Sequence, residues 1–323
     1  MKVGILGAGN IATSMATAIN GLSDDYELYA VASRDIEKAR KFSKDWNVER
    51  AYGSYEEMLS DDNIDLVYVA TPHSHHLEHT KLCIEYGKSA LVEKSFTANA
   101  EQAKEVLQMA EERNILVTEA IWTRYMPSRA LINEVIESGL IGNVTKVTAD
   151  LSYPISHIKR NYLPELAGGA LLDLGVYPIN FASMILGDEL TGIDGTCTYF
   201  DTGVDSQDSI TLTYQNGAMA TLSAGFYTGS PRIGTVYGTK GYINVLNINN
   251  PQKIVVYDNE YNMVKDVPVP KQINGYEYEV IACKRALENG QIECTEMPHK
   301  ETVRVMKVMD TLRNKWGIKY PFE

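Results

Sequence analysis

The sequence predicts an α/β protein of two domains: a Rossmann-type, doubly wound parallel sheet in residues 1–120, and an α+β domain with a large, mainly antiparallel sheet in residues 121–323. Three observations predict this division. Up to residue 120, short apolar runs alternate with amphipathic stretches, which is the pattern of βαβ units. A glycine-rich turn follows the first of these runs. Beyond residue 120, strand-like segments and turn signals dominate, especially in residues 191–267.

In the first domain the apolar runs are continuous, as expected for strands buried on both faces of a parallel sheet. Parallel strands need crossover connections, so helices are expected to cover both faces. The predicted strands are residues 3–6, 28–32, 66–70, 90–92 and 116–117, and the predicted helices are residues 11–19, 36–44, 55–59, 75–85 and 100–113.

In the second domain, turn signals such as Gln215-Asn216-Gly217 separate neighbouring strands and favour antiparallel pairing. The predicted strands are residues 145–153, 210–214, 218–224, 235–237, 242–245 and 254–257. The predicted helices are residues 127–138, 170–186, 276–288 and 300–316.

Charge and composition exclude several classes of function. The net charge of −12 argues against a nucleic-acid partner, because phosphate binding needs a basic surface. No run of eighteen apolar residues is present, which argues against a membrane-spanning helix. The N-terminus reads directly into a strand without the features of a signal peptide, and the four cysteines are widely scattered. We therefore expect a cytoplasmic protein with free thiols.

Residues 7–12, Gly-Ala-Gly-Asn-Ile-Ala, form a G-x-G-x-x-A turn between the first strand and the first helix. Gly7 permits the tight turn, Gly9 lets a pyrophosphate approach the backbone, and Ala12 allows close packing of helix on strand. The helix N-terminus, with Asn10 and Ile11, supplies amide donors. Such a turn alone is weak evidence, but its place in an N-terminal βαβ unit favours a nicotinamide dinucleotide site.

The end of the second strand bears on the choice between NAD and NADP. An enzyme that uses NAD places a carboxylate there for the ribose 2′-hydroxyl, whereas this chain has Ser33 and Arg34. A hydroxyl and a guanidinium are suited to a 2′-phosphate, so the sequence favours NADP, with NAD possible. The alternative is that Arg34 is a solvated charge or stacks on the adenine of either cofactor.

Three further segments carry chemistry. Residues 71–76, Thr-Pro-His-Ser-His-His, follow the predicted strand 66–70. Residues 87–95, Gly-Lys-Ser-Ala-Leu-Val-Glu-Lys-Ser, contain the next strand and its end. Residues 168–177, Gly-Gly-Ala-Leu-Leu-Asp-Leu-Gly-Val-Tyr, open a helix of the second domain.

This set resembles the glucose–fructose oxidoreductase / inositol dehydrogenase family nearly end to end. Glu93 and Lys94 match the first two positions of its Glu-Lys-Pro motif, and Ser95 departs from the proline that helps to shape that strand end. In the family's helix motif Asp173 and Gly175 match, whereas Tyr177 replaces the usual histidine. That replacement, together with residues 119–127, resembles most the dimeric dihydrodiol dehydrogenase branch, with NADP-dependent xylose dehydrogenases as close relatives.

The resemblance implies NADP as cofactor and a lysine paired with a tyrosine. It also implies cofactor contacts in the loop after the fourth strand, where His73 stands in place of the family's usual asparagine. The contacts in that loop would come from Thr71, Pro72 and His76, with further ones from the Glu93-Lys94 motif.

The chemistry of these residues points the same way. Oxidation of an alcohol carbon needs a group that takes the hydroxyl proton, and a tyrosine, with an ordinary pKa near ~10, needs a nearby cation to do so at neutral pH. Tyr177 is therefore predicted as the acid/base, Lys94 as the cation, and Asp173, one helical turn away, as the residue that orients the lysine. Taken singly, a helical tyrosine is more often a packing residue and a lysine more often a solvated charge.

Other residues are candidates for the crevice between the domains. Trp122 offers an apolar wall to the cofactor or substrate, with core packing as the alternative, and Arg124 is placed to reach the cofactor or a substrate oxygen. His157 and Arg160 are predicted to line the mouth of the substrate site. The cluster His73, His75, His76 and His79 suggests zinc, but matching ligands are lacking apart from Glu78, so no metal is predicted.

The function predicted from these residues is hydride transfer between NADP and a diol, sugar or related small molecule. A sensor that binds NADP without turnover is the alternative, because the same family contains a transcriptional repressor. A reductase of dicarbonyls would use identical residues. A homodimer is also expected, through a sheet face of the second domain that includes residues 210–214 and 218–224.

Overall fold

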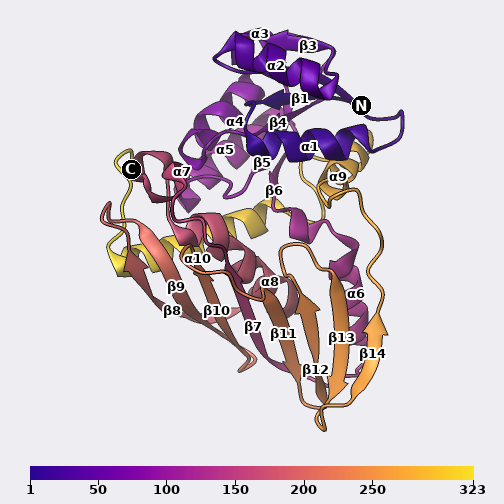
Figure 1. The fold of residues 1–323 in the computed structure, drawn as a ribbon, viewed down its shortest axis with the longest axis vertical. Coiled ribbons are helices and arrows are strands. Elements are labelled where there is room, and N and C mark those ends of the chain that lie inside the picture. The colour runs from indigo at the N-terminus through magenta and orange to yellow at the C-terminus, as the bar shows by residue number, and fades with distance from the viewer. The chain divides into compact units, whose positions relative to one another are not determined.

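In the computed structural model, which describes residues 1–323, the chain passes twice through each of two structural units (Figure 1). Unit 1 contains Met1–Tyr125 and Gln272–Val303, and unit 2 contains Met126–Lys271 and Arg304–Glu323. The boundary expected after residue 120 lies five residues before the first crossing. The return of residues 272–303 to unit 1 differs from the expected division, because the helix in that segment packs on the first helix of the chain.

Unit 1 is built on a six-stranded parallel sheet, which confirms the predicted doubly wound fold. The strand order is β3-β2-β1-β4-β5-β6, with the reversal beside β1 that is typical of a Rossmann sheet. The strands are β1 (Lys2–Leu6), β2 (Glu27–Ala32), β3 (Arg50–Tyr52), β4 (Leu66–Val69), β5 (Ser89–Glu93) and β6 (Val117–Ala120). Apart from β3 their residues are almost entirely buried, as their continuous apolar runs predicted.

Helices connect these strands, and three of them, α2, α3 and α5, begin at a side chain that caps the helix. Asp35, Ser54 and Asn99 each accept a backbone N–H two or three residues further on, which satisfies donors that the first helical turn leaves unpaired. The helices of unit 1 are α1 (Asn10–Asn20), α2 (Ile36–Trp46), α3 (Tyr55–Leu59), α4 (His76–Glu85), α5 (Ala100–Arg113) and α9 (Glu277–Glu288).

Unit 2 contains an eight-stranded sheet of order β14-β13-β12-β11-β7-β10-β9-β8. Only β7 and β10 pair in parallel, so the prediction of a mainly antiparallel sheet is confirmed. The strands are β7 (Val144–Ser152), β8 (Leu190–Tyr199), β9 (Asp205–Tyr214), β10 (Met219–Gly225), β11 (Ile233–Gly238), β12 (Gly241–Leu246), β13 (Lys253–Asp258) and β14 (Met263–Val267). The two edge strands β8 and β14 escaped prediction because they are largely exposed and lack an apolar alternation.

The remaining helices are α6 (Pro127–Glu137), α7 (Lys159–Tyr162), α8 (Val176–Leu186) and α10 (His299–Trp316), the last of which belongs to unit 1 up to Val303. Helix α8 packs on β7, β10 and β11, and a π-helical turn, Leu171–Gly175, leads into it. Apolar residues of β9 and β10, such as Ile210 and Leu222, are buried. The core of unit 2 therefore lies between its sheet and α8.

One helical segment, Pro164–Leu186, is long and apolar enough to cross a membrane, with a mean hydropathy of 1.4 over its best window. Of that window, 83% is buried inside the protein. Its apolar character is that of a helix at the centre of a core.

Candidate active site

The glycine-rich turn lies between the end of β1 and the start of α1, as predicted. Gly7 has φ +107°, and a Cβ there would stand 2.9 Å from the Ala70 carbonyl oxygen, so this position requires glycine. A Cβ on Gly9 would meet no atom within 4 Å. Gly9 caps α1 without a side-chain hydrogen bond, and the first turn carries no acidic residue. This helix N-terminus is suited to the pyrophosphate of a dinucleotide.

No carboxylate is available at the end of β2, where a Rossmann domain that binds NAD holds the ribose 2′-hydroxyl. Asp35, the first acid after the strand, accepts the backbone N–H of Glu37 at 3.0 Å and so caps α2. Ser33 is buried, and its hydroxyl accepts the Asp35 N–H at 3.3 Å. Arg34 is exposed. Serine and arginine therefore stand at this tip while the carboxylate is engaged elsewhere.

The loop after β4 is held by the imidazole of His76, which is fully buried. Its Nδ1 lies 2.8 Å from the Ser95 oxygen and its Nε2 lies 2.8 Å from the Thr71 oxygen. Burial lowers the pKa of His76 to about 4, although these backbone oxygens act in the opposite direction. His76 joins the loops after β4 and β5, a role that the sequence did not predict; its direct contact with a cofactor stays a prediction.

Lys94 follows β5 and is half-buried, and the Lys94–Ser95 peptide bond is cis. Glu93 is buried and accepts hydrogen bonds from the Tyr68 hydroxyl and from the Lys94 backbone N–H. Glu93 therefore fixes the end of β5, and the cofactor contact expected of it stays a prediction.

Trp122 and Arg124 lie in the short 3-10 helix after β6, and both are buried within unit 1. The Trp122 ring stacks on Tyr276 with 4.2 Å between centroids, which matches the packing alternative, although its indole N–H has no hydrogen-bond partner. Arg124 Nη2 lies 2.9 Å from a Glu301 carboxylate oxygen. This buried ion pair gives Arg124 a structural role within unit 1 that the sequence did not indicate.

Asp173 and Tyr177 stand one helical turn apart in unit 2, both almost fully buried. Asp173 lies in the π-helical turn and Tyr177 in the first turn of α8. Arg160 Nη1 and Nη2 lie 3.3 and 3.4 Å from the two Asp173 carboxylate oxygens. The structure thus brings together Arg160, predicted for the substrate mouth, and Asp173, predicted as an orienting residue. His157 is exposed in the loop before α7.

The start of this helix is anchored by two residues that sequence reasoning missed. Asp205 accepts the Leu171 backbone N–H at 2.5 Å, and the Tyr320 hydroxyl donates to the Gly168 carbonyl at 2.8 Å. A Cβ on Gly168 would stand 2.8 Å from the Asn161 oxygen, which explains one of the paired glycines. No local signal marks such partners, because they lie 34 and 152 residues away.

Three side chains of the histidine cluster have potential metal-ligand atoms within 4.8 Å of one another: His75, Glu78 and His79. Burial lowers the pKa of His79 to about 4, and the charges of His75, His76 and Arg34 act in the same direction. A cation bound to His79 would meet the same repulsion.

Comparison with known proteins identifies the family. Residues 1–120 match the family described as an oxidoreductase family with an NAD-binding Rossmann fold, and residues 130–244 match the GFO/IDH/MocA C-terminal domain. The chain belongs to the GFO/IDH/MocA oxidoreductases. Its unit 1 contains the dinucleotide-binding domain of this family, which agrees with the glycine turn and the open helix N-terminus described above.

Several GFO/IDH/MocA relatives are similar over nearly their whole length. Trans-1,2-dihydrobenzene-1,2-diol dehydrogenase from Mus musculus is 31% identical, over 99% of this chain and 98% of its own. D-xylose 1-dehydrogenase (NADP(+)) from Hypocrea jecorina is 34% identical, over 99% of this chain and 93% of its own. These are the two groups that the sequence motifs resemble.

Solved structures share the fold. A 3-ketoreductase from Actinomadura kijaniata, in complex with NADP and TDP-benzene, has a TM-score of 0.87 and 25% identity, with 97% of each chain covered. An aldose-aldose oxidoreductase from Caulobacter crescentus has a TM-score of 0.86 at 19% identity, and covers 97% of this chain and 96% of its own. At such identity the second likeness concerns the fold alone.

Proposed function

We propose that this protein is an NADP-dependent oxidoreductase that transfers a hydride between the nicotinamide and a hydroxyl or carbonyl carbon of a diol, sugar or related small molecule. The observation that carries the cofactor preference is the tip of β2, where Ser33 and Arg34 replace a carboxylate and Asp35 is engaged as a helix cap. The near full-length similarity to diol and NADP-dependent xylose dehydrogenases supports the substrate class.

The residues of this chain fit the cofactor on structural grounds. Gly9 leaves its surroundings open, and the first turn of α1 has no competing acid, so amide donors are available to a pyrophosphate. When bound, the nicotinamide accepts or supplies the hydride. Thr71 and Pro72 lie in the loop that His76 and Ser95 hold in place, and we assign this loop to cofactor binding.

We assign the proton transfer to Tyr177. As the substrate carbon loses its hydride, its hydroxyl loses a proton, and the Tyr177 phenolate accepts it; in the reverse direction the phenol returns the proton to the carbonyl oxygen. The Lys94 ammonium would stabilise that phenolate by its charge. The ion pair of Arg160 with Asp173 fixes the π-helical turn that precedes Tyr177.

We also propose that the protein is a homodimer, but the interface is assigned to other strands of the unit 2 sheet than the two expected from the sequence. Apart from Met219, which is 43% exposed, the apolar side chains of residues 210–214 and 218–224 are buried in the core of unit 2, so these strands offer little apolar surface to an interface. Three half-buried tyrosines that alternate with buried residues of β11, β12 and β13 are better candidates: Tyr237, Tyr242 and Tyr257. The ring centroids of Tyr237 and Tyr242 are 6.0 Å apart, and those of Tyr242 and Tyr257 are 5.0 Å apart. The Lys146 ammonium lies over the ring of Tyr237.

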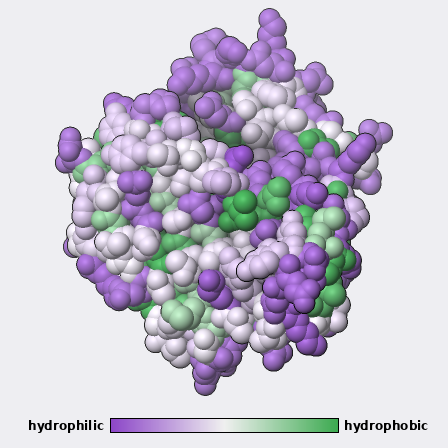
Figure 2. Space-filling model, turned by 60° about the horizontal axis from the view of Figure 1, so that its bottom comes forward, coloured by the Kyte–Doolittle hydropathy of each residue, from purple (hydrophilic) through white to green (hydrophobic).

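Such a row of aromatic rings is suited to association. The face drawn in Figure 2 carries broad areas of intermediate hydropathy and separate hydrophobic groups, with hydrophilic residues around them. The purified protein should run as a dimer in light scattering, and Tyr242→Lys should shift it towards the monomer. A wild-type monomer at micromolar concentration would contradict this part of the proposal.

The test of the function is absorbance at 340 nm with NADP or NAD and a panel of diols and aldoses, followed by NADPH with dicarbonyls. Turnover with NADP that clearly exceeds turnover with NAD is the expected result. Tight NADPH binding without turnover on any substrate of the panel would favour the sensor that the family also includes.

A further inference from the structure

Helix α8, which carries Tyr177, begins at one particular end of the unit 2 sheet. At this end Gly225, the last residue of β10, pairs with Ser152 of β7 and with Gln207 of β9. Asp205, at the start of β9, accepts a backbone N–H of the π-helical turn that leads into α8. Strand β11 also starts here, beside the end of β7. The residues around the start of β11 therefore lie at the same end of the sheet as Tyr177.

Arg232 directly precedes β11 at this end of the sheet. Phe181, one helical turn after Tyr177 on the same face of α8, packs over β11: a Cβ on Gly234 would stand 2.5 Å from its ring. The same Cβ would stand 2.6 Å from Ile248, whose backbone N–H donates to the Arg232 oxygen at 2.8 Å. Arg232 thus adjoins the contact between α8 and β11, on the side where the helix begins.

The guanidinium of Arg232 is held in one place. Its Nη1 donates to the Tyr153 hydroxyl at 2.7 Å, and the group lies over the Tyr153 ring, 5.0 Å from its centroid. Asn249 Nδ2 lies 3.1 Å from the same hydroxyl, and the Ser230 hydroxyl accepts the Arg232 backbone N–H at 3.2 Å. Arg232 has φ +56°, a conformation that persists in a residue with a side chain where its surroundings fix it.

No carboxylate forms an ion pair with Arg232, although the chain has 42 acidic and 30 basic residues. The guanidinium is half-buried, and apart from the bond to Tyr153 its N–H groups donate to no protein atom. Asp150, an acid of β7, instead accepts the hydroxyls of Ser152 at 3.4 Å and Ser223 at 2.6 Å. A positive charge with free donors is therefore fixed near the start of α8.

The neighbouring loop adds further positive charge. Ile155 donates its backbone N–H to the Phe226 oxygen at 3.0 Å, which attaches the loop after β7 to the same end of the sheet. This loop leads into α7 with Lys159 and Arg160, and the Asp173 carboxylate is neutralised by Arg160. The charges next to Arg232 thus favour an anion.

We propose that Arg232 binds an anionic group of the substrate, a carboxylate or a phosphate, so that an acidic or phosphorylated sugar is preferred to its neutral counterpart. This inference rests on the proposed oxidoreductase function. The planar guanidinium can donate two parallel hydrogen bonds to either group. Because Tyr153 and Asn249 hold it before the substrate arrives, less entropy is lost on binding. Arg232 takes no part in hydride or proton transfer.

The test compares D-glucose, D-glucuronate and D-glucose 6-phosphate as substrates of the full chain with NADP, in kinetics at 340 nm. The three compounds differ only at C6, which carries a hydroxymethyl, a carboxylate or a phosphate group. The wild type should show a higher kcat/KM for an anionic compound than for glucose, and the better of the two identifies the group. Arg232→Gln should raise the KM for that compound about tenfold, with kcat and the glucose kinetics little changed.

Two further variants separate the guanidinium from general effects of charge. Arg232→Lys restores the charge without the planar fork and should recover part of the lost affinity. Lys240→Gln removes an exposed cation at the opposite end of β11 and should leave all three KM values unchanged. Thermal unfolding shows whether Arg232→Gln remains folded, and isothermal titration calorimetry with the two anionic sugars in the presence of NADP measures binding without turnover.

The outcomes distinguish this inference from the proposed function. If the wild type turns over sugars but uses glucose as well as its anionic derivatives, or if Arg232→Gln raises all three KM values equally, the anion site is overturned and the oxidoreductase function stands. If no compound is turned over with either cofactor, calorimetry decides. Binding of an anionic sugar that Arg232→Gln weakens would support the site without the function, and absence of binding would overturn the site as well.

Discussion

The guanidinium of Arg160 and the carboxylate of Asp173 form a two-point ion pair, with N–O distances of 3.3 and 3.4 Å. The side chain of Asp173 is 5% exposed and that of Arg160 is 49% exposed, so a guanidinium at the surface neutralises a buried carboxylate. Removal of the guanidinium would leave the Asp173 carboxylate in a poorly solvated place, beside the turn that positions Tyr177.

Arg160→Ala is therefore expected to lower kcat/KM about three- to tenfold, because the π-helical turn loses a restraint worth ~1 kcal/mol. Steady-state kinetics with the best substrate of the panel check this expectation. Lys159→Ala, a neighbouring exposed change, should have little effect. Equal kinetics of the two variants would show that the ion pair does not support the site.

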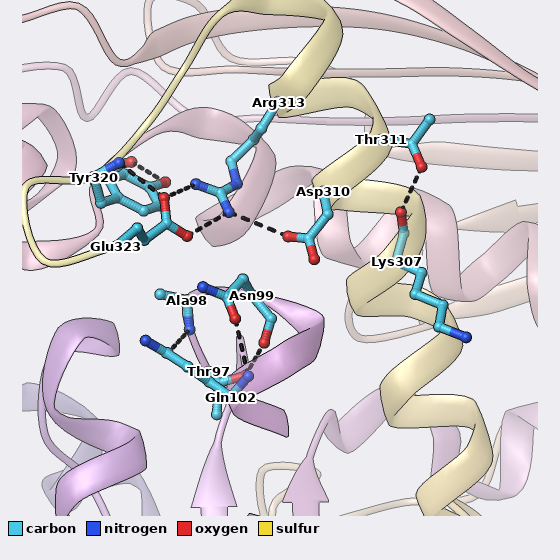
Figure 3. Close-up of polar contacts among 11 residues, drawn as sticks. Thr97, Ala98, Asn99, Gln102, Lys307, Asp310, Thr311, Arg313, Tyr320 and Glu323 are labelled. Carbon is cyan, nitrogen blue, oxygen red and sulfur yellow. Dashed lines mark hydrogen bonds and ion pairs between the residues drawn. The ribbon is translucent and has the colours of Figure 1, made fainter. Parts of the chain in front are cut away.

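The segment that carries Tyr320 and Glu323 fastens the start of the same helix. Arg313 donates to both carboxylate oxygens of Glu323 at 2.8 and 3.0 Å and to Asp310 at 3.1 Å, as Figure 3 shows. Glu323 also accepts the Tyr320 backbone N–H at 2.9 Å. Because the Arg313 side chain is only 5% exposed, these carboxylate partners replace the water that would otherwise stabilise its charge.

Glu323→Gln should lower the free energy of unfolding by about 2–4 kcal/mol, since it leaves a buried guanidinium partly unpaired. Thermal and urea unfolding measure this change. Thr311→Ala is the control and should change stability much less, because it removes an exposed hydroxyl of α10, the helix of Arg313, that donates to the Lys307 carbonyl. A melting temperature equal to that of the wild type would show that the ion pair of Arg313 with Glu323 contributes nothing to stability.

Asp205 and Asp208 form a buried pair of acids in β9. Burial raises the pKa of Asp205 to about 6, and burial together with the Asp205 charge raises the pKa of Asp208 well above its ordinary value. The unfolded chain releases these protons near pH ~4, while the folded chain retains them. The free energy of unfolding should therefore fall as pH rises from about 4 through about 6.

Because the asparagine of Asp208→Asn cannot ionise, this variant should lose the part of the pH-dependent fall in the free energy of unfolding that Asp208 causes. It should raise the free energy of unfolding at pH 8 by about 1–3 kcal/mol, and have a much smaller effect near pH 4.5. Urea unfolding at the two pH values checks the difference, with the exposed change Asp201→Asn as a control of equal charge. An identical pH dependence in Asp208→Asn and wild type would contradict the buried-acid explanation.

The sequence predicted most of the fold because the strands of unit 1 are continuous apolar runs and Gly7 stands where a positive φ is needed. It failed where local pattern carries no information. The edge strands β8 and β14 are mostly exposed, and the helix α9 returns to unit 1 although its amphipathic pattern would suit either unit.

The candidate site was predicted unevenly for the same reason. The glycine turn and the Ser33-Arg34 tip are local motifs and could be found in sequence. The partners Arg160 and Asp173 are 13 residues apart across a loop, so only the folded chain reveals them. His76 joins two loops through its buried ring, a role that no local motif indicates, and its contact with the cofactor stays a prediction.

The central claim is that Tyr177 transfers the substrate proton, and kinetics at 340 nm with Tyr177→Phe test it most directly. With NADP and the best substrate, kcat should fall about 100-fold or more while NADPH binding is retained, because only the acid/base is lost. Tyr227→Phe, an exposed tyrosine of unit 2, should retain wild-type turnover. Full turnover by Tyr177→Phe in an otherwise intact protein would contradict the account.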